Sequence, residues 1–455
     1  MHGTYEGLDR AGGFDRSGML SPLKGRDFRL LWMGMSISLL GDGIFLIAVT
    51  WQAYELSSLP TALSLVGVAM TVPHVVFLLF GGVISDRFPR RKVMLGADVV
   101  RGVAIGAIAV LSMMGALELV HLAALAALYG AGTAFFGPAF DAIVPDVVPE
   151  RLLPQANALD QLVKPLTLRL AGPALGGLIV GAWGPGAAFG VDAATFAFSA
   201  MALLMMSSVE RPAWTGRSFV AELRSGYAFV LGEVWLWGTF VAAAVAYLLF
   251  MGPAEVLLPF ILKEDMGGSA ADLGLVFAVG GVGSILSAIA VSSSQFPRRN
   301  ITFMYGAWTL STLAIGGYGL ANLPWHLMAA SFAFNFLETA GTIVWITTKQ
   351  RLVPIALLGR VSSIDWLISI GLLPLSFALT GPAAAAFGAR STLMGAGVLG
   401  AGVTMAAFFL PGMRAMERPP ADEPPGRAGP DRREDLSLRP LYKSSPERAT
   451  AVPPL

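Results

Sequence analysis

The sequence predicts an all-α membrane protein with twelve transmembrane helices in two pseudo-symmetric six-helix bundles. Three observations support this fold class. The 455 residues are 55% hydrophobic and 13% charged, whereas soluble globular proteins carry about 25% charged residues. Twelve long apolar runs follow one another along the chain. Short motifs in the first half return at a nearly constant distance in the second half.

The charged residues are unevenly distributed. The segment from Pro411 to the end holds 15 of the 61 charged residues and 10 of the 29 prolines. The charged residues in the rest of the chain are too few to cover a water-facing surface of that size, whereas a lipid-facing surface needs few charges. A net charge of +1 leaves no basic stripe for nucleic acid. With no cysteine and four scattered histidines, we expect no disulfide, no metal and no cofactor.

Each apolar run is long enough to cross a membrane, which takes about 20 residues. The runs are too long and too uniformly apolar for barrel strands. The predicted spans are 28–54, 62–85, 93–115, 120–140, 163–183, 187–206, 234–262, 270–293, 301–322, 325–347, 360–384 and 389–411.

Lysine and arginine in the short connections predict the orientation. One set of connections, together with the N-terminal segment, holds nineteen of these residues, and the opposite set holds only Lys263 and Arg390. Because basic loops stay on the cytoplasmic side, we expect both termini to be cytoplasmic. We expect the protein to be a monomer in the plasma membrane.

An internal repeat divides the chain. Phe88-Pro89-Arg90-Arg91 returns as Phe296-Pro297-Arg298-Arg299, and Gly172-Pro173 returns as Gly381-Pro382. Two such halves can rock about a site at the middle of the membrane. The predicted regions are an N-terminal cytoplasmic segment (1–27), a first bundle (28–206), a linker with an amphipathic helix (207–233), a second bundle (234–411) and a disordered tail (412–455).

A glycine and charge motif lies between the second and third spans. It comprises Gly82, Asp86, Arg87, Arg90 and Arg91. A glycine permits close helix approach, and the charges can form ion pairs or interact with helix ends. Such contacts can hold one state of a rocking protein and release it in the other. The alternative interpretation is an ordinary basic loop.

Asp365, about one turn inside the eleventh span, is predicted to belong to the same cytoplasmic gate.

The fifth span contains Gly172, Pro173, Gly176 and Gly177. Glycines about one turn apart let helices pack closely, and proline bends a helix and frees backbone groups. Simple close packing is the alternative to a functional role.

Several ionisable residues lie within the predicted spans, where charge is costly and therefore marks functional candidates. We assign Asp42, Glu255, Glu338 and Arg169 to the proton and substrate pathway. The alternative for each carboxyl is a satisfied hydrogen bond or a packing ion pair. A structural role is favoured for three other residues. Asp98 and Arg101, three residues apart on the third span, are predicted to form a salt bridge on one helix, and Asp192 lies near a helix start, where an acid is favourable.

The two motifs resemble those of the major facilitator superfamily. Gly82, Asp86, Arg87, Arg90 and Arg91 match its motif A, although Pro89 replaces the family's glycine. The resemblance implies that Asp86 braces the start of the eleventh span, near 359–362. Gly172 to Gly177 resembles motif C, which marks drug-exporting antiporters. The fourth span lacks the family's arginine, so Arg169 or Arg101 is the candidate to replace it.

Further segments resemble the enterobactin-exporter and macrolide-efflux-like branch. They are Leu40-Gly41-Asp42-Gly43, the stretch 138–145, Gln155-Ala156-Asn157-Ala158-Leu159, the stretch 191–196 and the stretch 359–363. The resemblance implies export of a hydrophobic or amphipathic small molecule by proton antiport with alternating access. A siderophore or lysophospholipid transporter on the same fold is the alternative. A membrane-embedded lipid-modifying enzyme is disfavoured, because no paired catalytic motif such as His-Glu-x-x-His is present. We therefore expect no enzyme activity.

Overall fold

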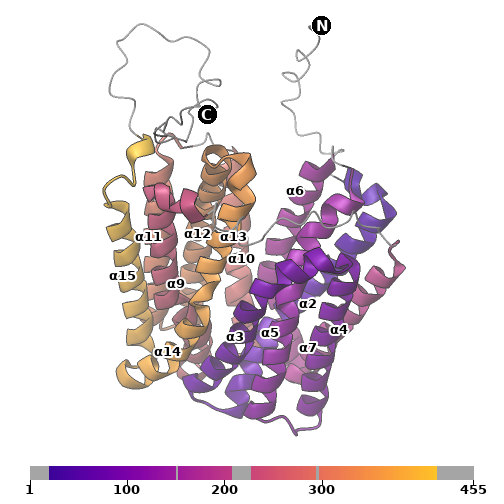
Figure 1. Cartoon of the computed structure of the whole chain (residues 1–455). Helices are drawn as coiled ribbons and strands as arrows, with labels where there is room; N and C mark the ends of the chain where they lie inside the picture. The colour runs from indigo at the N-terminus through magenta and orange to yellow at the C-terminus, as the bar shows by residue number, and fades with distance from the viewer. Residues whose placement is uncertain (1–19, 150–151, 208–226, 294–296, 418–455) are drawn as a thin grey trace, which may run out of the picture. The chain divides into compact units, whose positions relative to one another are not determined.

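The computed structural model describes residues 20–149, 152–207, 227–293 and 297–417, and these residues form helices joined by short turns (Figure 1). The chain divides into two units by contacts, Met1–Arg414 and Ala415–Leu455. All the long helices belong to the first unit. In the second unit, the described residues form one short 3₁₀ helix, Ala415–Glu417.

The first group of helices lies between residues 21 and 205. A short 3₁₀ helix, η1 (Ser21–Lys24), is followed by α2 (Arg26–Leu56), α3 (Pro60–Arg87), α4 (Arg90–Met113), α5 (Leu119–Val147), α6 (Leu153–Lys164), the π-helical segment η3 (Pro165–Ala171) and α7 (Gly172–Met205). Within this group α2 packs on α7, α3 on α5, and α4 on both α5 and α7.

The second group lies between residues 234 and 408. It comprises α9 (Val234–Phe260), the π-helical η4 (Ile261–Asp265), α10 (Ala270–Ser293), α11 (Asn300–Leu320), α12 (Pro324–Leu352), α13 (Ile355–Gly371), α14 (Leu373–Phe387) and α15 (Ala389–Phe408). Here α10 and α11 pack on α12, while α15 packs on α9 and α11. The two groups meet through α7 with α10 and through α3 with α14.

By length and hydropathy, ten helices of the described chain are able to cross a membrane. One of them, Gln155–Met205, holds two passes, because Gly184 leaves the helical conformation at φ 81° and reverses the chain. The twelfth pass is α11, whose Thr, Ser, Tyr and Gly residues lower its hydropathy. The predicted all-α membrane fold class is therefore confirmed.

Four predicted spans need correction. The span predicted as 120–140 continues to Val147, and the span predicted as 325–347 continues to Leu352. The span predicted to begin at 163 begins at Leu153, because polar residues of α6 extend the helix beyond the apolar run. The span predicted as 360–384 is broken at Leu372 into α13 and α14. Pro374 lies at the start of α14 and has no backbone N–H to continue the hydrogen bonding of α13.

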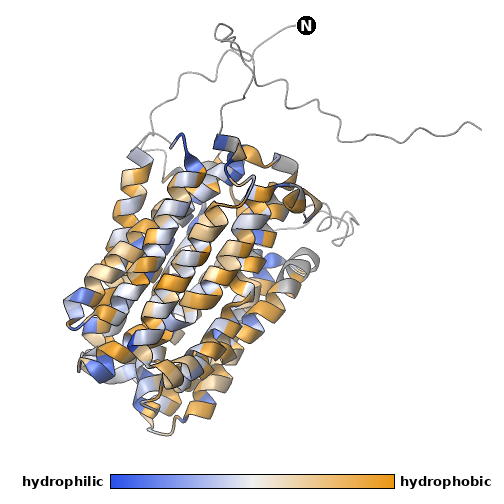
Figure 2. Ribbon diagram, turned by 90° about the vertical axis from the view of Figure 1, so that its left-hand side faces the viewer, coloured by the Kyte–Doolittle hydropathy of each residue, from blue (hydrophilic) through white to orange (hydrophobic). Residues whose placement is uncertain are grey.

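Large apolar side chains lie on the outside of the helices. Val103, Val110, Val398 and Leu399 are all more than half exposed. Figure 2 shows hydrophobic residues along the lengths of the helices and many of the hydrophilic residues near their ends. Exposing an apolar surface of this kind to water is unfavourable, whereas contact with lipid chains is favourable.

We call the end of the helices that holds the start of α2 and the end of α15 the basic end, because Arg26, Arg90, Arg91 and Lys92 lie there. The other end is called the opposite end. Of the predicted linker and tail, residues 208–226 and 418–455 lie outside the described residues. The predicted N-terminal segment falls outside them up to residue 19.

Candidate functional site

A buried polar cluster lies inside the first group of helices, and we call it the N-terminal cluster. Its centre is Arg101 on α4, which is 3% exposed and pairs with Asp98 at 2.5 Å. A guanidinium nitrogen of Arg101 also lies 4.0 Å from Asp42 Oδ2 on α2. The hydroxyl of Tyr129 on α5 donates a 2.7 Å hydrogen bond to Asp42 Oδ1. The cluster therefore joins three transmembrane passes through one carboxyl.

The remaining members of this cluster come from α7. Ser199 donates a 2.6 Å hydrogen bond to Asp98 Oδ2. Asp192 is fully buried, and its Oδ1 accepts a 3.2 Å hydrogen bond from Thr195. Its Oδ2 has no hydrogen-bond partner among the described residues. Asp192 lies beside Asp42, because a Cβ added to Gly41, the neighbour of Asp42 in the chain, would clash with Asp192 Oδ1.

Aromatic rings enclose the guanidinium. The Arg101 Cζ lies 4.4 Å from the ring centroid of Phe136 and 4.5 Å from that of Phe196. Such contacts stabilise a cation that has little access to water. The N-terminal cluster thus has three carboxyls, Asp42, Asp98 and Asp192, around one guanidinium in an apolar shell.

A second polar cluster connects the two groups of helices. Arg169 in the π-helical segment η3 is about half exposed, and its guanidinium lies 3.8 Å from Glu338 on α12. It also donates a long hydrogen bond of 3.4 Å to Asn335. Glu255 on α9 lies within electrostatic reach of Arg169. The structure therefore brings together three of the four residues assigned to the pathway, and it places Asp42 apart from them in the N-terminal cluster.

The glycines of the fifth pass have distinct neighbours. A Cβ at Gly172 would lie 2.7 Å from the Cα of Gly43, and one at Gly176 would lie 3.0 Å from the Cα of Ile44, both on α2. Gly177 instead faces the other group, since its Cβ would lie 2.7 Å from the carbonyl oxygen of Ala270 on α10. The motif therefore permits close packing on two sides of one helix.

Proline and π-helical geometry set the path of this pass. Pro165 begins η3 and Pro173 is the second residue after its end, so neither position supplies a backbone donor. The N–H of Gly172 bonds the carbonyl of Thr167 across five residues. π-helical turns of this kind are frequent at functional sites, and this one carries Arg169.

The two groups touch at the opposite end through several specific contacts. The hydroxyl of Tyr54 on α2 donates a 2.6 Å hydrogen bond to the carbonyl of Val256 on α9. The Lys263 ammonium lies 4.7 Å from the Trp51 ring centroid. On α3, a Cβ at Gly67 would clash with the ring of Phe377 on α14. These contacts hold the two groups together at this end.

At the basic end, two arginines of the glycine and charge motif, which we call the gate motif, contact other helices of the first group. Arg90 pairs with Asp146 on α5 at 2.7 Å, and Arg91 donates to the carbonyl of Leu204 on α7 at 2.7 Å. The side chains of Asp86 and Arg87 and the surroundings of Gly82 lie outside the described residues, so the gating contact of this motif stays a prediction.

Asp365 on α13 pairs with the buried Lys349 on α12 and accepts a 3.0 Å hydrogen bond from Trp345 Nε1. All three belong to the second group. Asp365 therefore stabilises the packing of α13 on α12, and its predicted part in a gate between the halves stays a prediction.

Sequence reasoning assigned no role to Tyr129, Ser199 or Thr195, which supply the hydrogen bonds of the N-terminal cluster. The sequence marks these residues only as hydroxyl side chains inside predicted spans, and such residues are too common there for these three to be identified as functional. Asp98 and Arg101 were interpreted as a pair three residues apart on one helix; that pair is confirmed, and the structure adds Asp42 to it.

Comparison with known proteins identifies the family. A family model described as "Transmembrane secretion effector", of the major facilitator type, matches residues 17–428. The chain belongs to the major facilitator superfamily. Since the proteins of this superfamily are transporters, it is a multi-pass membrane transporter, and the membrane-enzyme alternative is excluded.

Relatives in the superfamily support the branch indicated by the motifs. The multidrug efflux pump Tap of Mycolicibacterium fortuitum is 26% identical over 83% of this chain and 94% of its own length. The enterobactin exporter EntS of Shigella boydii is 27% identical over 74% of this chain and 80% of its own.

A solved major facilitator structure supports the fold. The crystal structure of a bacterial homologue of the iron transporter ferroportin, in an inward-facing state, matches with a TM-score of 0.65. It covers 84% of this chain and 99% of that chain at 15% identity. At this identity the likeness shows the fold alone.

Proposed function

We propose that this transporter exports a hydrophobic or amphipathic small molecule, such as a drug or antibiotic, in exchange for protons. The observation that carries the proposal is the N-terminal cluster, in which the buried Asp98 and the part-buried Asp42 pair with one guanidinium and the fully buried Asp192 lies beside Asp42. Fully ionised, the cluster would hold an excess of negative charge away from water, which is costly. Binding a proton from outside removes part of this charge.

Asp42 and Asp192 are the proton-binding groups in this proposal. Asp98 already has a short ion pair with Arg101 and a hydrogen bond from Ser199. Asp42 lies at the 4.0 Å limit of an ion pair, and Asp192 Oδ2 has no partner in the described chain. These two carboxyls therefore have the least compensation for an ionised state, and they lie next to each other.

The substrate pathway in this proposal runs between the two groups of helices, along Arg169, Glu255 and Glu338. These side chains come from different groups, so rocking of one group against the other would change their distances. The contacts that join the two groups at the opposite end support a state in which this pathway is open toward the basic end. If the basic end is cytoplasmic, as loop charge indicates, this is the inward-facing state of a plasma-membrane monomer.

The relatives support two substrate classes. Similarity to a multidrug efflux pump favours a drug-like molecule, and similarity to an enterobactin exporter favours a siderophore. The half-exposed Arg169 offers a contact for an acidic group, and Glu338 offers one for a basic group.

A substrate panel in an efflux-deficient host tests this function. We expect cells that produce the protein to accumulate less of at least one compound, and a protonophore to abolish the difference. Asp42→Asn is expected to behave like the empty host, while Glu264→Gln, an exposed carboxyl at the opposite end, behaves like wild type. Export that survives both the protonophore and Asp42→Asn would reject proton antiport.

A further inference from the structure

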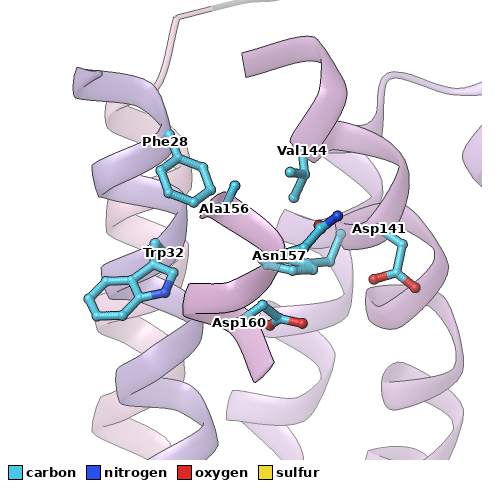
Figure 3. Close-up of a pocket in the computed structure, with 8 residues that line it drawn as sticks. Phe28, Trp32, Asp141, Val144, Ala156, Asn157 and Asp160 are labelled. Carbon is cyan, nitrogen blue, oxygen red and sulfur yellow. The ribbon is translucent and has the colours of Figure 1, made fainter. Parts of the chain in front are cut away.

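A cavity separate from both polar clusters lies at the basic end of the first group of helices. It has a volume of about 160 Å³. Three helices line it: α2 through Phe28 and Trp32, the end of α5 through Phe140, Asp141 and Val144, and α6 through Ala156, Asn157 and Asp160. Figure 3 shows Trp32 on the α2 side, and Asn157 and Asp160 on α6 with Asp141 beyond them on α5. Neither the gate motif nor the proposed substrate pathway uses these residues.

Two buried polar atoms among the lining residues lack a partner in the described chain. They are the Trp32 Nε1 donor and the Asp160 Oδ1 acceptor. A buried donor or acceptor without a partner is destabilising by about 1–3 kcal/mol, so such atoms call for an occupant. An N–H needs an acceptor oxygen, and a carboxylate oxygen needs a donor. The occupant must therefore offer both.

The charge around the cavity favours a cation. Asp160 pairs with Lys164 at 2.7 Å. Asp141 has no ion pair among the described residues, and it lies within electrostatic reach of both Asp160 and Lys164. Among the described residues, one negative charge is thus left without a counterion, on an exposed side chain at the edge of the cavity. The rings of Phe28, Trp32 and Phe140 supply aromatic faces, which attract organic ammonium groups.

We propose that this cavity binds an organic ammonium group that carries a nearby oxygen, as in an amino alcohol. The ammonium would lie between Asp141 and Asp160 and donate to Asp160 Oδ1, while the oxygen would accept from Trp32 Nε1. A single water needs about 10–15 Å³ of such volume, so the cavity has room for a group of this size.

This chemistry has two sources. One is the headgroup of phosphatidylethanolamine, whose phosphate and ammonium lie at the depth of helix ends in a membrane. The other is a free amine from the aqueous phase. The proposal concerns binding alone, so it stands or falls independently of proton-coupled export.

Binding to the purified full-length protein tests the proposal. In native mass spectrometry from a detergent mixture, we expect the wild type to retain phosphatidylethanolamine in preference to phosphatidylglycerol. In a parallel arm, ethanolamine is titrated calorimetrically into delipidated protein. Retention of the lipid without ethanolamine binding would identify a headgroup site, and binding of ethanolamine would identify a site open to free amines.

Three variants make the test specific. Asp141→Asn removes the unpaired charge without breaking an ion pair of the described chain, and we expect it to weaken binding about tenfold. Trp32→Phe keeps an aromatic ring but removes the N–H, and we expect it to weaken binding severalfold. Glu264→Gln removes an exposed carboxyl at the opposite end and should leave binding unchanged.

Either of two results would overturn the proposal. In the first, the wild type does not retain phosphatidylethanolamine in preference to phosphatidylglycerol and does not bind ethanolamine, which would mean that water alone fills the cavity. In the second, Asp141→Asn and Trp32→Phe both bind as tightly as wild type. Circular dichroism and melting temperature establish that each variant is folded, and the two variants give independent readouts.

Discussion

Tyr129 donates a 2.7 Å hydrogen bond to Asp42 from the fourth transmembrane pass to the first, inside the first group of helices. This contact holds the carboxyl in the interior of the group, 4.0 Å from the guanidinium of Arg101. A carboxyl positioned in this way can exchange a proton without contact with lipid chains. Because the hydrogen bond comes from the Tyr129 hydroxyl, its contribution to stability can be measured by changing Tyr129 while Asp42 is kept.

Tyr129→Phe is expected to destabilise the protein by about 1.5–3 kcal/mol, because it removes a hydrogen bond to a charged group in a buried site. Melting of the purified protein in detergent measures this loss. Tyr305→Phe is the matched control, since its hydroxyl bonds the neutral Thr239 in the second group, and a loss of about 1 kcal/mol is expected there. Equal melting temperatures for wild type and Tyr129→Phe would contradict the geometry.

Arg101→Met is expected to destabilise the protein strongly, by about 3–5 kcal/mol, because it leaves the buried Asp98 without its counterion. Adding Asp98→Asn removes the stranded charge, so the double variant should regain much of the lost stability. Melting temperature and yield after solubilisation report both effects. A double variant less stable than Arg101→Met would show that Asp98 does not depend on this ion pair.

Gly177→Ala is expected to reduce transport at least tenfold. Its added Cβ would meet the carbonyl of Ala270 at 2.7 Å and push α7 and α10 apart, whereas closure of the opposite end needs them in contact. Gly181→Ala is the matched control, because it lies one turn further along the same helix with open space around it. Equal transport by the two variants would show that this helix contact has no role in the cycle.

Glu338→Gln is expected to change transport while leaving stability nearly unchanged. Its ion pair with Arg169 is long, at 3.8 Å, and Arg169 is about half exposed, so the pair contributes at most about 1 kcal/mol to stability. Substrate binding and melting temperature, measured on the same preparation, separate the two effects. A large loss of stability with unchanged substrate binding would identify the pair as structural.

The sequence predicted the membrane class, the number of passes and several buried charges, because hydropathy and loop charge act over short stretches of chain. It did not predict the N-terminal cluster as a unit. Asp42, Arg101, Tyr129 and Asp192 lie on four different passes, and their meeting depends on how helices rotate against one another. Hydropathy contains no information on this rotation.

The break at Leu372 was missed although its cause is present in the sequence. Pro374 is visible there, but membrane helices commonly tolerate proline, so the residue alone did not predict a break. The two faces of the glycine motif were missed for a different reason. Gly176 contacts α2 and Gly177 contacts α10, and adjacent glycines give no sign of which neighbour each one meets.

Movement of the two groups is open to direct measurement with spin labels on introduced cysteines, because the chain contains no native cysteine that would have to be removed first. Lys92→Cys with Arg299→Cys labels the basic end, and Ser58→Cys with Asn322→Cys labels the opposite end. We expect the first distance to shorten and the second to lengthen when substrate and pH are varied. Distances that change in the same direction at both ends would contradict alternating access.

The central claim is that a proton gradient drives export through the N-terminal cluster, and transport by the purified protein in liposomes tests it most directly. With a substrate identified from the panel, an imposed pH gradient is predicted to drive transport by the wild type. Collapse of the gradient, or Asp42→Asn in a folded protein, is predicted to stop it. Transport that continues at the wild-type rate without a gradient, or in Asp42→Asn, would contradict the account.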